Sequence, residues 1–133
     1  MQQQHQESTR PRVLDVGNCD PDHASIQRLL GRFEVDVDRV MFVEEAVVAL
    51  AKSRYDLVLV NRLIFADGSD GLPLIQRMKA DARFQKIPVM MVSNYPEAQD
   101  RAVSEGAVRG FGKADLNEPR TLELLKPYLA RAS

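Results

Sequence analysis

The sequence predicts a single α/β domain in which five strands and five helices alternate along the chain. Short β-branched runs are separated by stretches whose apolar residues repeat at helical spacing, a pattern typical of βα units on a parallel sheet. The chain has 133 residues, and the 44% that are apolar suffice for one core. A net charge of −1 provides no general attraction to nucleic acid or to anionic membranes, so we expect neither as a direct partner.

The polar segment 1–11 has no apolar face to bury, and we predict that it is a disordered tail ahead of a domain over residues 12–131. No apolar stretch resembles a signal peptide or a membrane span. Cys19 is the single cysteine, which is typical of a reducing compartment. These features favour a cytoplasmic protein. His5 and His23 lie in no metal-ligand spacing, so no metal site is predicted from them.

The first strand is expected at RVLDV, residues 12–16, followed by a helix over residues 20–33. Asp20 is predicted as the N-cap of this helix, with Pro21 at its first position. Its apolar residues recur at i, i+3, i+4 and i+7, which is the spacing of one helix face. They are Ile26, Leu29, Leu30 and Phe33.

The middle of the chain continues the alternation. EVDVDRVM, residues 34–41, indicates a short second strand, and residues 43–53 indicate a helix. The apolar residues on one face of that helix are Val43, Ala46, Val47 and Leu50. DLVLV, residues 56–60, is an unbroken apolar run, as expected for a strand covered on both faces.

The second half repeats the pattern, with proline at or near the start of each expected helix. Right-handed crossovers between parallel strands then lead to a flavodoxin-like doubly wound sheet with strand order 2-1-3-4-5. The elements expected here are helices over residues 72–84, 96–106 and 118–132 and strands over residues 87–93 and 108–113.

Three polar side chains end or follow predicted strands. Asn61 follows LVLV, Ser93 follows VMMV and Lys113 follows GFG. In doubly wound sheets, ligands bind at the carboxyl ends of the strands. We therefore expect these three side chains to converge at one edge of the sheet.

At this point the sequence resembles the receiver domains of two-component response regulators. EEAVVALAKSRYDLVLVN is similar to the family's second helix and third strand, KIPVMMVSNY to its fourth strand, and EGAVRGFGK to its Gly-Ala turn and fifth strand. The resemblance covers residues 12–131 and implies a role in phosphorelay signal transduction. In that family the third strand ends in a phosphoacceptor aspartate, the fourth in Ser or Thr and the fifth in Lys, and an acidic pair after the first strand holds Mg²⁺.

The resemblance fails at the residues that carry the chemistry. Asn61 occupies the phosphoacceptor position, and a neutral amide is a poor nucleophile. The acidic pair falls on Gly17 and Asn18, whereas Mg²⁺ prefers carboxylate oxygens. The inward-turning aromatic residue of the family's switch falls on Gly110. We therefore expect no catalytic residue, no cofactor, and weak or absent Mg²⁺ binding.

Ser93 and Lys113 match the family residues that contact the phosphoryl group. Without a phosphoryl group, the alternative role of Ser93 is to cap the next turn. For Lys113 a salt bridge is favoured over a bound anion. The carboxylates considered as its partner are Asp15, Asp20, Asp67 and Asp70.

The leading hypothesis is a pseudo-receiver that cannot be phosphorylated and acts by binding a protein such as a sensor kinase, another regulator or a second copy of itself. The resemblance places its contact face on the fourth helix, fifth strand and fifth helix, where Tyr95, Val108 and Arg109 are the candidates. One alternative is a relocated acceptor at Asp67 or Asp70, in a loop longer than the family's. Another is a small-anion or nucleotide module built from GNCDPD with Ser93 and Lys113, although no phosphate-binding glycine motif supports it.

Overall fold

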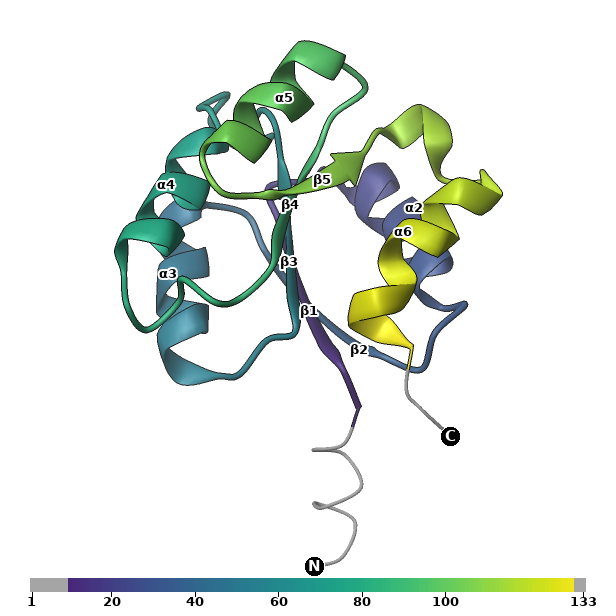
Figure 1. Ribbon diagram of the computed structural model, residues 1–133, viewed down its shortest axis with the longest axis horizontal. Helices are drawn as coiled ribbons and strands as arrows, with labels where there is room; N and C mark the ends of the chain where they lie inside the picture. The colour runs from purple at the N-terminus through teal and green to yellow at the C-terminus, as the bar shows by residue number, and fades with distance from the viewer. Residues whose placement is uncertain (1–9, 131–133) are drawn as a thin grey trace, which may run out of the picture.

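The computed structural model describes residues 10–130 and contains one parallel sheet of five strands in the order β2-β1-β3-β4-β5. Helices α3, α4 and α5 cover one face of the sheet, and α2 and α6 cover the other (Figure 1). The predicted fold class and strand order are confirmed. The elements are β1 (Arg12–Val16), α2 (Asp20–Leu30), β2 (Asp36–Val40), α3 (Val43–Lys52), β3 (Leu57–Asn61), α4 (Leu72–Ala80), β4 (Val89–Val92), α5 (Pro96–Ser104), β5 (Val108–Phe111), a 3-10 turn (Lys113–Asp115) and α6 (Pro119–Leu129).

Two cores lie on the two faces of the sheet, because successive side chains of a strand point to opposite sides. In β3, Leu57 and Leu59 pack with α2 and α6, whereas Val58 and Val60 pack with α3, α4 and α5. All four side chains are 0% exposed, which confirms the prediction of a strand covered on both faces. Each such burial stabilises the fold by about 1.5–3 kcal/mol, so the central strands hold the sheet edge rigidly.

Both predicted boundaries of helix α2 were wrong. Asp20 is the first residue of α2 rather than its N-cap; Cys19 is the N-cap and makes no side-chain capping bond. The Asp20 carboxylate instead pairs with Nη2 of Arg39 at 2.7 Å, so a tertiary contact outweighed the local cap. Helix α2 also ends at Leu30 rather than at Phe33, because Gly31 forms its C-cap.

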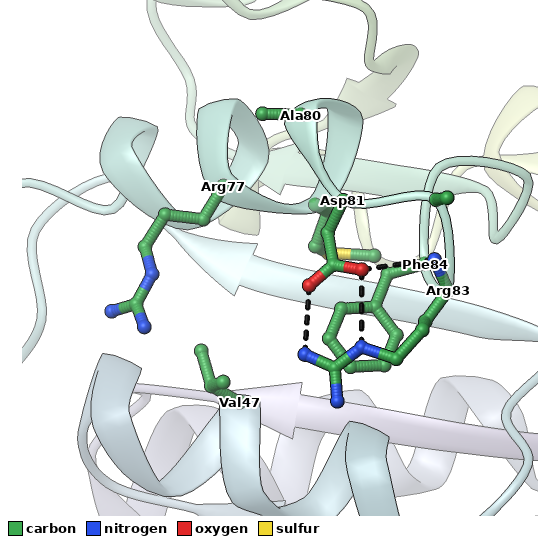
Figure 2. A pocket seen from close by; sticks show the side chains of 8 residues that line it. Val47, Arg77, Ala80, Asp81, Arg83 and Phe84 are labelled. Carbon is green, nitrogen blue, oxygen red and sulfur yellow. Dashed lines mark hydrogen bonds and ion pairs between the residues drawn. The ribbon is translucent and has the colours of Figure 1, made fainter.

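Helix α4 ends at Ala80 rather than at residue 84, because Asp81 leaves the helix in an extended conformation. The Asp81 carboxylate accepts hydrogen bonds from the backbone nitrogen of Arg83 at 2.9 Å and from its Nη2 at 2.8 Å. Figure 2 shows this pair beside a pocket of about 440 Å³ between α3 and α4. The turn that follows Asp81 places Phe84 in the core.

The predicted tail over residues 1–11 lies outside the described residues except for Arg10 and Pro11. These two residues run beside β2: the backbone nitrogen of Asp36 donates to the carbonyl oxygen of Pro11 at 2.9 Å, and Arg10 Nε lies 3.4 Å from Asp36 Oδ1. The end of the predicted domain, residue 131, also lies outside the described residues. Within residues 10–130, no helix combines the length and apolar character needed to span a membrane.

Candidate functional site

The carboxyl ends of β3, β4 and β5 form the edge of the sheet where the sequence predicted a site. Backbone hydrogen bonds tie these ends together, since Arg62 N donates to Val92 O at 3.1 Å and Ser93 N donates to Phe111 O at 3.0 Å. We call this edge the rim; it carries Asn61, Ser93 and Lys113. Their side chains do not bond to one another, and each is held by a different partner described below.

The side chain of Asn61 acts as a double hydrogen-bond donor. Its Nδ2 atom donates to the carbonyl oxygen of Leu63 at 2.6 Å and to that of Gly17 at 3.2 Å. The Gly17 oxygen also accepts from the backbone nitrogen of Phe65 at 2.9 Å. An ionised carboxylate has no donor for either carbonyl. The amide therefore closes the loop after β3 onto the loop after β1.

Gly17 cannot be replaced by an acidic residue without rearrangement. Its φ angle is +80°, and a Cβ atom there would lie 2.5 Å from Cδ1 of Ile64. Ile64 is fully buried and belongs to the core beneath α3 and α4. Ile64, in the loop after β3, thus fills the space beside Gly17 at the end of β1.

Asn18 is fully buried and turned inward. Its Nδ2 atom donates to Asp15 Oδ1 at 2.6 Å, and the other oxygen of Asp15 lies 2.5 Å from Nδ1 of His23. The Asn18 side-chain oxygen is buried and has no hydrogen-bond partner among residues 10–130. In that same range, no group of three or more His, Cys, Asp and Glu side chains is arranged to hold a metal ion.

Lys113 forms the predicted kind of contact with an unpredicted partner. Its Nζ atom lies 2.7 Å from Asp22 Oδ2, and the hydrogen bond from Lys113 is the main cause that lowers the pKa of Asp22. The prediction named four other carboxylates and was wrong in this respect. Lys113 begins a 3-10 turn, which directs it toward the first turn of α2.

Comparison with solved structures agrees with the observed fold. No protein-family model matches the sequence, and no curated protein matches it. A solved structure described as a response regulator from Chloroflexus aurantiacus J-10-fl has 24% identity and a TM-score of 0.78, and the match covers 92% of this chain and 100% of that one. The chain has the fold of a response-regulator receiver domain.

Other solved structures support the same fold. The signal receiver domain of an HD domain-containing protein from Pseudomonas fluorescens Pf-5 has 20% identity and a TM-score of 0.74, over 90% of this chain and 94% of that one. The phosphorylated cyanobacterial phytochrome response regulator RcpA has 20% identity and a TM-score of 0.73, over 94% of this chain and 98% of that one. The receiver fold therefore spans nearly the whole chain.

Ser93 directly follows β4, and its hydroxyl is engaged in a turn. The Oγ atom accepts a hydrogen bond from the backbone nitrogen of Tyr95 at 3.1 Å, and the residue is buried. This is the capping role that the sequence offered as the alternative to a phosphoryl contact.

Gln99 is a buried polar residue that the sequence analysis missed. Its Nε2 atom donates to Met91 O at 2.9 Å and to Ser93 O at 3.2 Å, and its Oε1 atom accepts from Gly110 N at 2.8 Å. One side chain of α5 thus bridges β4 and β5. Its position three residues before Ala102, on the buried helix face, was the available signal.

Gly110, at the family's switch position, has no room for a side chain. A Cβ atom there would overlap the carbonyl oxygen of Met91 and would lie 3.1 Å from Cβ of Met90. An inward-turning aromatic residue therefore does not fit at this point of β5.

The two candidates for a relocated acceptor are both held in turns of the receiver fold. Asp67 Oδ1 accepts from Ser69 N at 2.9 Å and from Ser69 Oγ at 2.6 Å, and the Ser69 hydroxyl is the main cause that lowers the pKa of Asp67. Asp70 Oδ1 accepts from Leu72 N at 2.9 Å. These bonds match ordinary turn chemistry and direct both carboxylates into their own loop.

The candidate contact residues differ in exposure. Tyr95 is 58% exposed, and the Arg62 guanidinium lies 5.0 Å from the centroid of its ring. Arg109 is paired with Asp100 on the surface. Val108 is partly buried and packs against the core beneath α2 and α6, so it also supports the fold.

Proposed function

We propose that this chain is a pseudo-receiver of two-component phosphorelay signalling, which forms no aspartyl phosphate and acts by binding another protein. The observation that carries the proposal is the double donation from Asn61 to Gly17 and Leu63. A phosphoacceptor must present a nucleophilic oxygen, whereas the amide is neutral and its nitrogen is committed to two carbonyl groups.

The proposal includes weak or absent Mg²⁺ binding and no catalytic activity of its own. The family positions of the acidic pair hold Gly17 and Asn18, which supply no carboxylate. Asp15 is the carboxylate in β1, and both of its oxygens already meet side-chain donors. A divalent cation would therefore have to displace internal bonds of the fold before it gained ligands.

The proposed partner is a sensor kinase, another regulator or a second copy of the chain, in the cytoplasm. The proposed contact face comprises α5, β5 and α6, with Tyr95, Val108 and Arg109. Exposed tyrosine and arginine side chains are enriched among the residues that dominate binding energy at interfaces. The arginine contact on Tyr95 supports this assignment, because it restricts the ring before any partner binds.

Treatment with acetyl phosphate and Mg²⁺ tests the loss of aspartyl chemistry. Intact mass before and after mild alkali is the measurement, because alkali cleaves acyl phosphates. We expect no alkali-labile phosphoryl group on the parent protein and no rise in its melting temperature with Mg²⁺. An aspartyl phosphate on any residue would overturn the proposal.

Sedimentation equilibrium tests the second copy as partner. We expect a concentration-dependent dimer that Tyr95→Ala weakens and that Phe42→Ala leaves unchanged. Phe42 is an exposed aromatic residue that precedes α3, away from the proposed face, so it is a matched control. A strictly monomeric parent would restrict the proposal to partners other than the chain itself.

A further inference from the structure

A histidine and a buried carboxylate form a pair at the start of α2. Nδ1 of His23 lies 2.5 Å from Oδ2 of Asp15, which comes from β1 and is 0% exposed. The other oxygen of Asp15 accepts from Asn18 at 2.6 Å. A carboxylate only accepts hydrogen bonds, so Nδ1 of His23 carries a proton, and in the neutral imidazole Nε2 is the nitrogen with the lone pair.

The second ring nitrogen of His23 reaches the surface. Among residues 10–130, Nε2 has no hydrogen-bond partner, and the two buried side-chain atoms without a partner belong to Asn18 and Arg39. The His23 side chain is 14% exposed. Nε2 is therefore the ring nitrogen left without a hydrogen bond in the described part of the chain, on a side chain that is not fully buried.

The two carboxylates that flank His23 in the first turn of α2 are each paired with a cation. The neighbouring carboxylates are balanced, since Asp22 pairs with Lys113 at 2.7 Å and Asp20 pairs with Arg39 at 2.7 Å. The first turn of α2 adds the positive end of the helix dipole. An approaching phosphoryl group thus meets no unpaired carboxylate from these residues.

We propose that His23 is a phosphoryl acceptor for small, reactive phosphoramidates. The lone pair of Nε2 attacks phosphorus and forms an N–P bond, while the bond from phosphorus to the donor nitrogen breaks. The donor nitrogen leaves with that electron pair and takes a proton from solvent. The modified ring keeps its proton on Nδ1, and its positive charge faces the Asp15 carboxylate.

Asp15 is a positioning residue in this scheme, because it contacts the imidazole and not the phosphoryl group. The scheme goes beyond the proposed function, which concerns Asn61 and a protein-binding face. If His23 only satisfied a buried carboxylate, it would accept no phosphoryl group in the test below.

The test uses the full chain and potassium phosphoramidate, with intact mass and ³¹P NMR as readouts. We expect one added phosphoryl group that is lost in acid and survives alkali, which separates phosphohistidine from an alkali-labile aspartyl phosphate. His23→Gln should abolish it. His5→Gln is the matched control, because the chain has 2 histidines, and it should leave the reaction unchanged.

Asp15→Asn tests the positioning role. We expect the phosphorylation rate to fall by about tenfold or more, because the asparagine no longer fixes the tautomer. The tautomer is measured on the unmodified parent by long-range ¹H–¹⁵N NMR, so a variant that fails to fold does not remove the test. The proton on Nδ1 supports the proposal, and a proton on Nε2 would overturn it.

Absence of the phosphoryl group, or its appearance on His5 instead, would also refute the assignment to His23. Neither result bears on the pseudo-receiver proposal. Conversely, an alkali-labile phosphoryl group would refute the pseudo-receiver proposal and leave the His23 assignment untouched.

Discussion

Nδ2 of Asn61 donates a hydrogen bond of 3.2 Å to the carbonyl oxygen of Gly17, and so joins the loop after β3 to the loop after β1. The same nitrogen bonds Leu63 at 2.6 Å, which folds its own loop back on itself. Two carbonyl groups at the rim therefore accept hydrogen bonds from one amide nitrogen.

The substitution Asn61→Asp should destabilise the protein. The carboxylate loses both donated bonds and faces two carbonyl oxygens, at an expected cost of about 1–3 kcal/mol in the free energy of unfolding. Urea denaturation measures this cost. Asn117→Asp, in an exposed turn, is the control and should change stability by less than about 0.5 kcal/mol. An Asn61→Asp variant as stable as the parent would contradict the assigned role.

Gly17→Ala should destabilise through both strain and overlap. The φ angle of +80° disfavours any Cβ, and the added methyl group would also meet Ile64. Gly68→Ala is the matched control, because Gly68 has φ +71° and no atom within 4 Å of the added Cβ. We expect Gly17→Ala to cost about 1–3 kcal/mol more than Gly68→Ala in urea denaturation.

Ile64→Val tests whether overlap with Ile64 causes the extra cost of Gly17→Ala over Gly68→Ala. It removes Cδ1, the atom closest to the added methyl group, so the double variant should recover part of the cost. Additive effects of the two substitutions would mean that the overlap is relieved in another way.

The ion pair between Lys113 and Asp22 should make stability depend on acid pH. The hydrogen bond from Lys113 holds the pKa of Asp22 below its ordinary value of 3.8. A lowered carboxyl pKa contributes stability that is present above pH 3.8 and is lost as pH falls through the folded-state pKa. The difference in melting temperature between the parent and Asp22→Asn should therefore shrink as pH falls through this window.

Lys113→Met is the companion variant for the pH experiment, because it removes the cation that lowers the pKa. It should lose the same acid dependence as Asp22→Asn. If the difference in melting temperature between the parent and these variants did not change with pH, the ion pair would not be the cause of the acid dependence of stability.

Gln99→Leu should loosen the attachment of β5 to β4. It leaves Met91 O, Ser93 O and Gly110 N without their side-chain partner in a buried site, which costs about 1–3 kcal/mol or more. Gln76→Leu, exposed on α4, is the control. Amide hydrogen exchange at Gly110 should accelerate in Gln99→Leu alone, and unchanged protection would contradict the bridging role.

The fold could be predicted from local patterns because each element carried its own signal. The apolar run of β3 required cover on both faces, and the four apolar positions of the first predicted helix defined one face. Helix ends were less predictable. Asp20 was predicted as an N-cap, yet it pairs with the distant Arg39, and the helix predicted over residues 72–84 ends before Asp81, which starts a turn toward the core.

The sequence by itself determined the parallel sheet, its strand order and the presence of an amide, Asn61, at the end of the third strand. Only the tertiary structure decided what each polar side chain bonds: Lys113 meets Asp22, His23 meets Asp15, and Gln99 bridges two strands. The physical reason is the range of the interactions. Hydrophobic periodicity is repeated over many neighbouring residues, whereas a hydrogen bond depends on a few tenths of an ångström between groups that lie far apart in the chain.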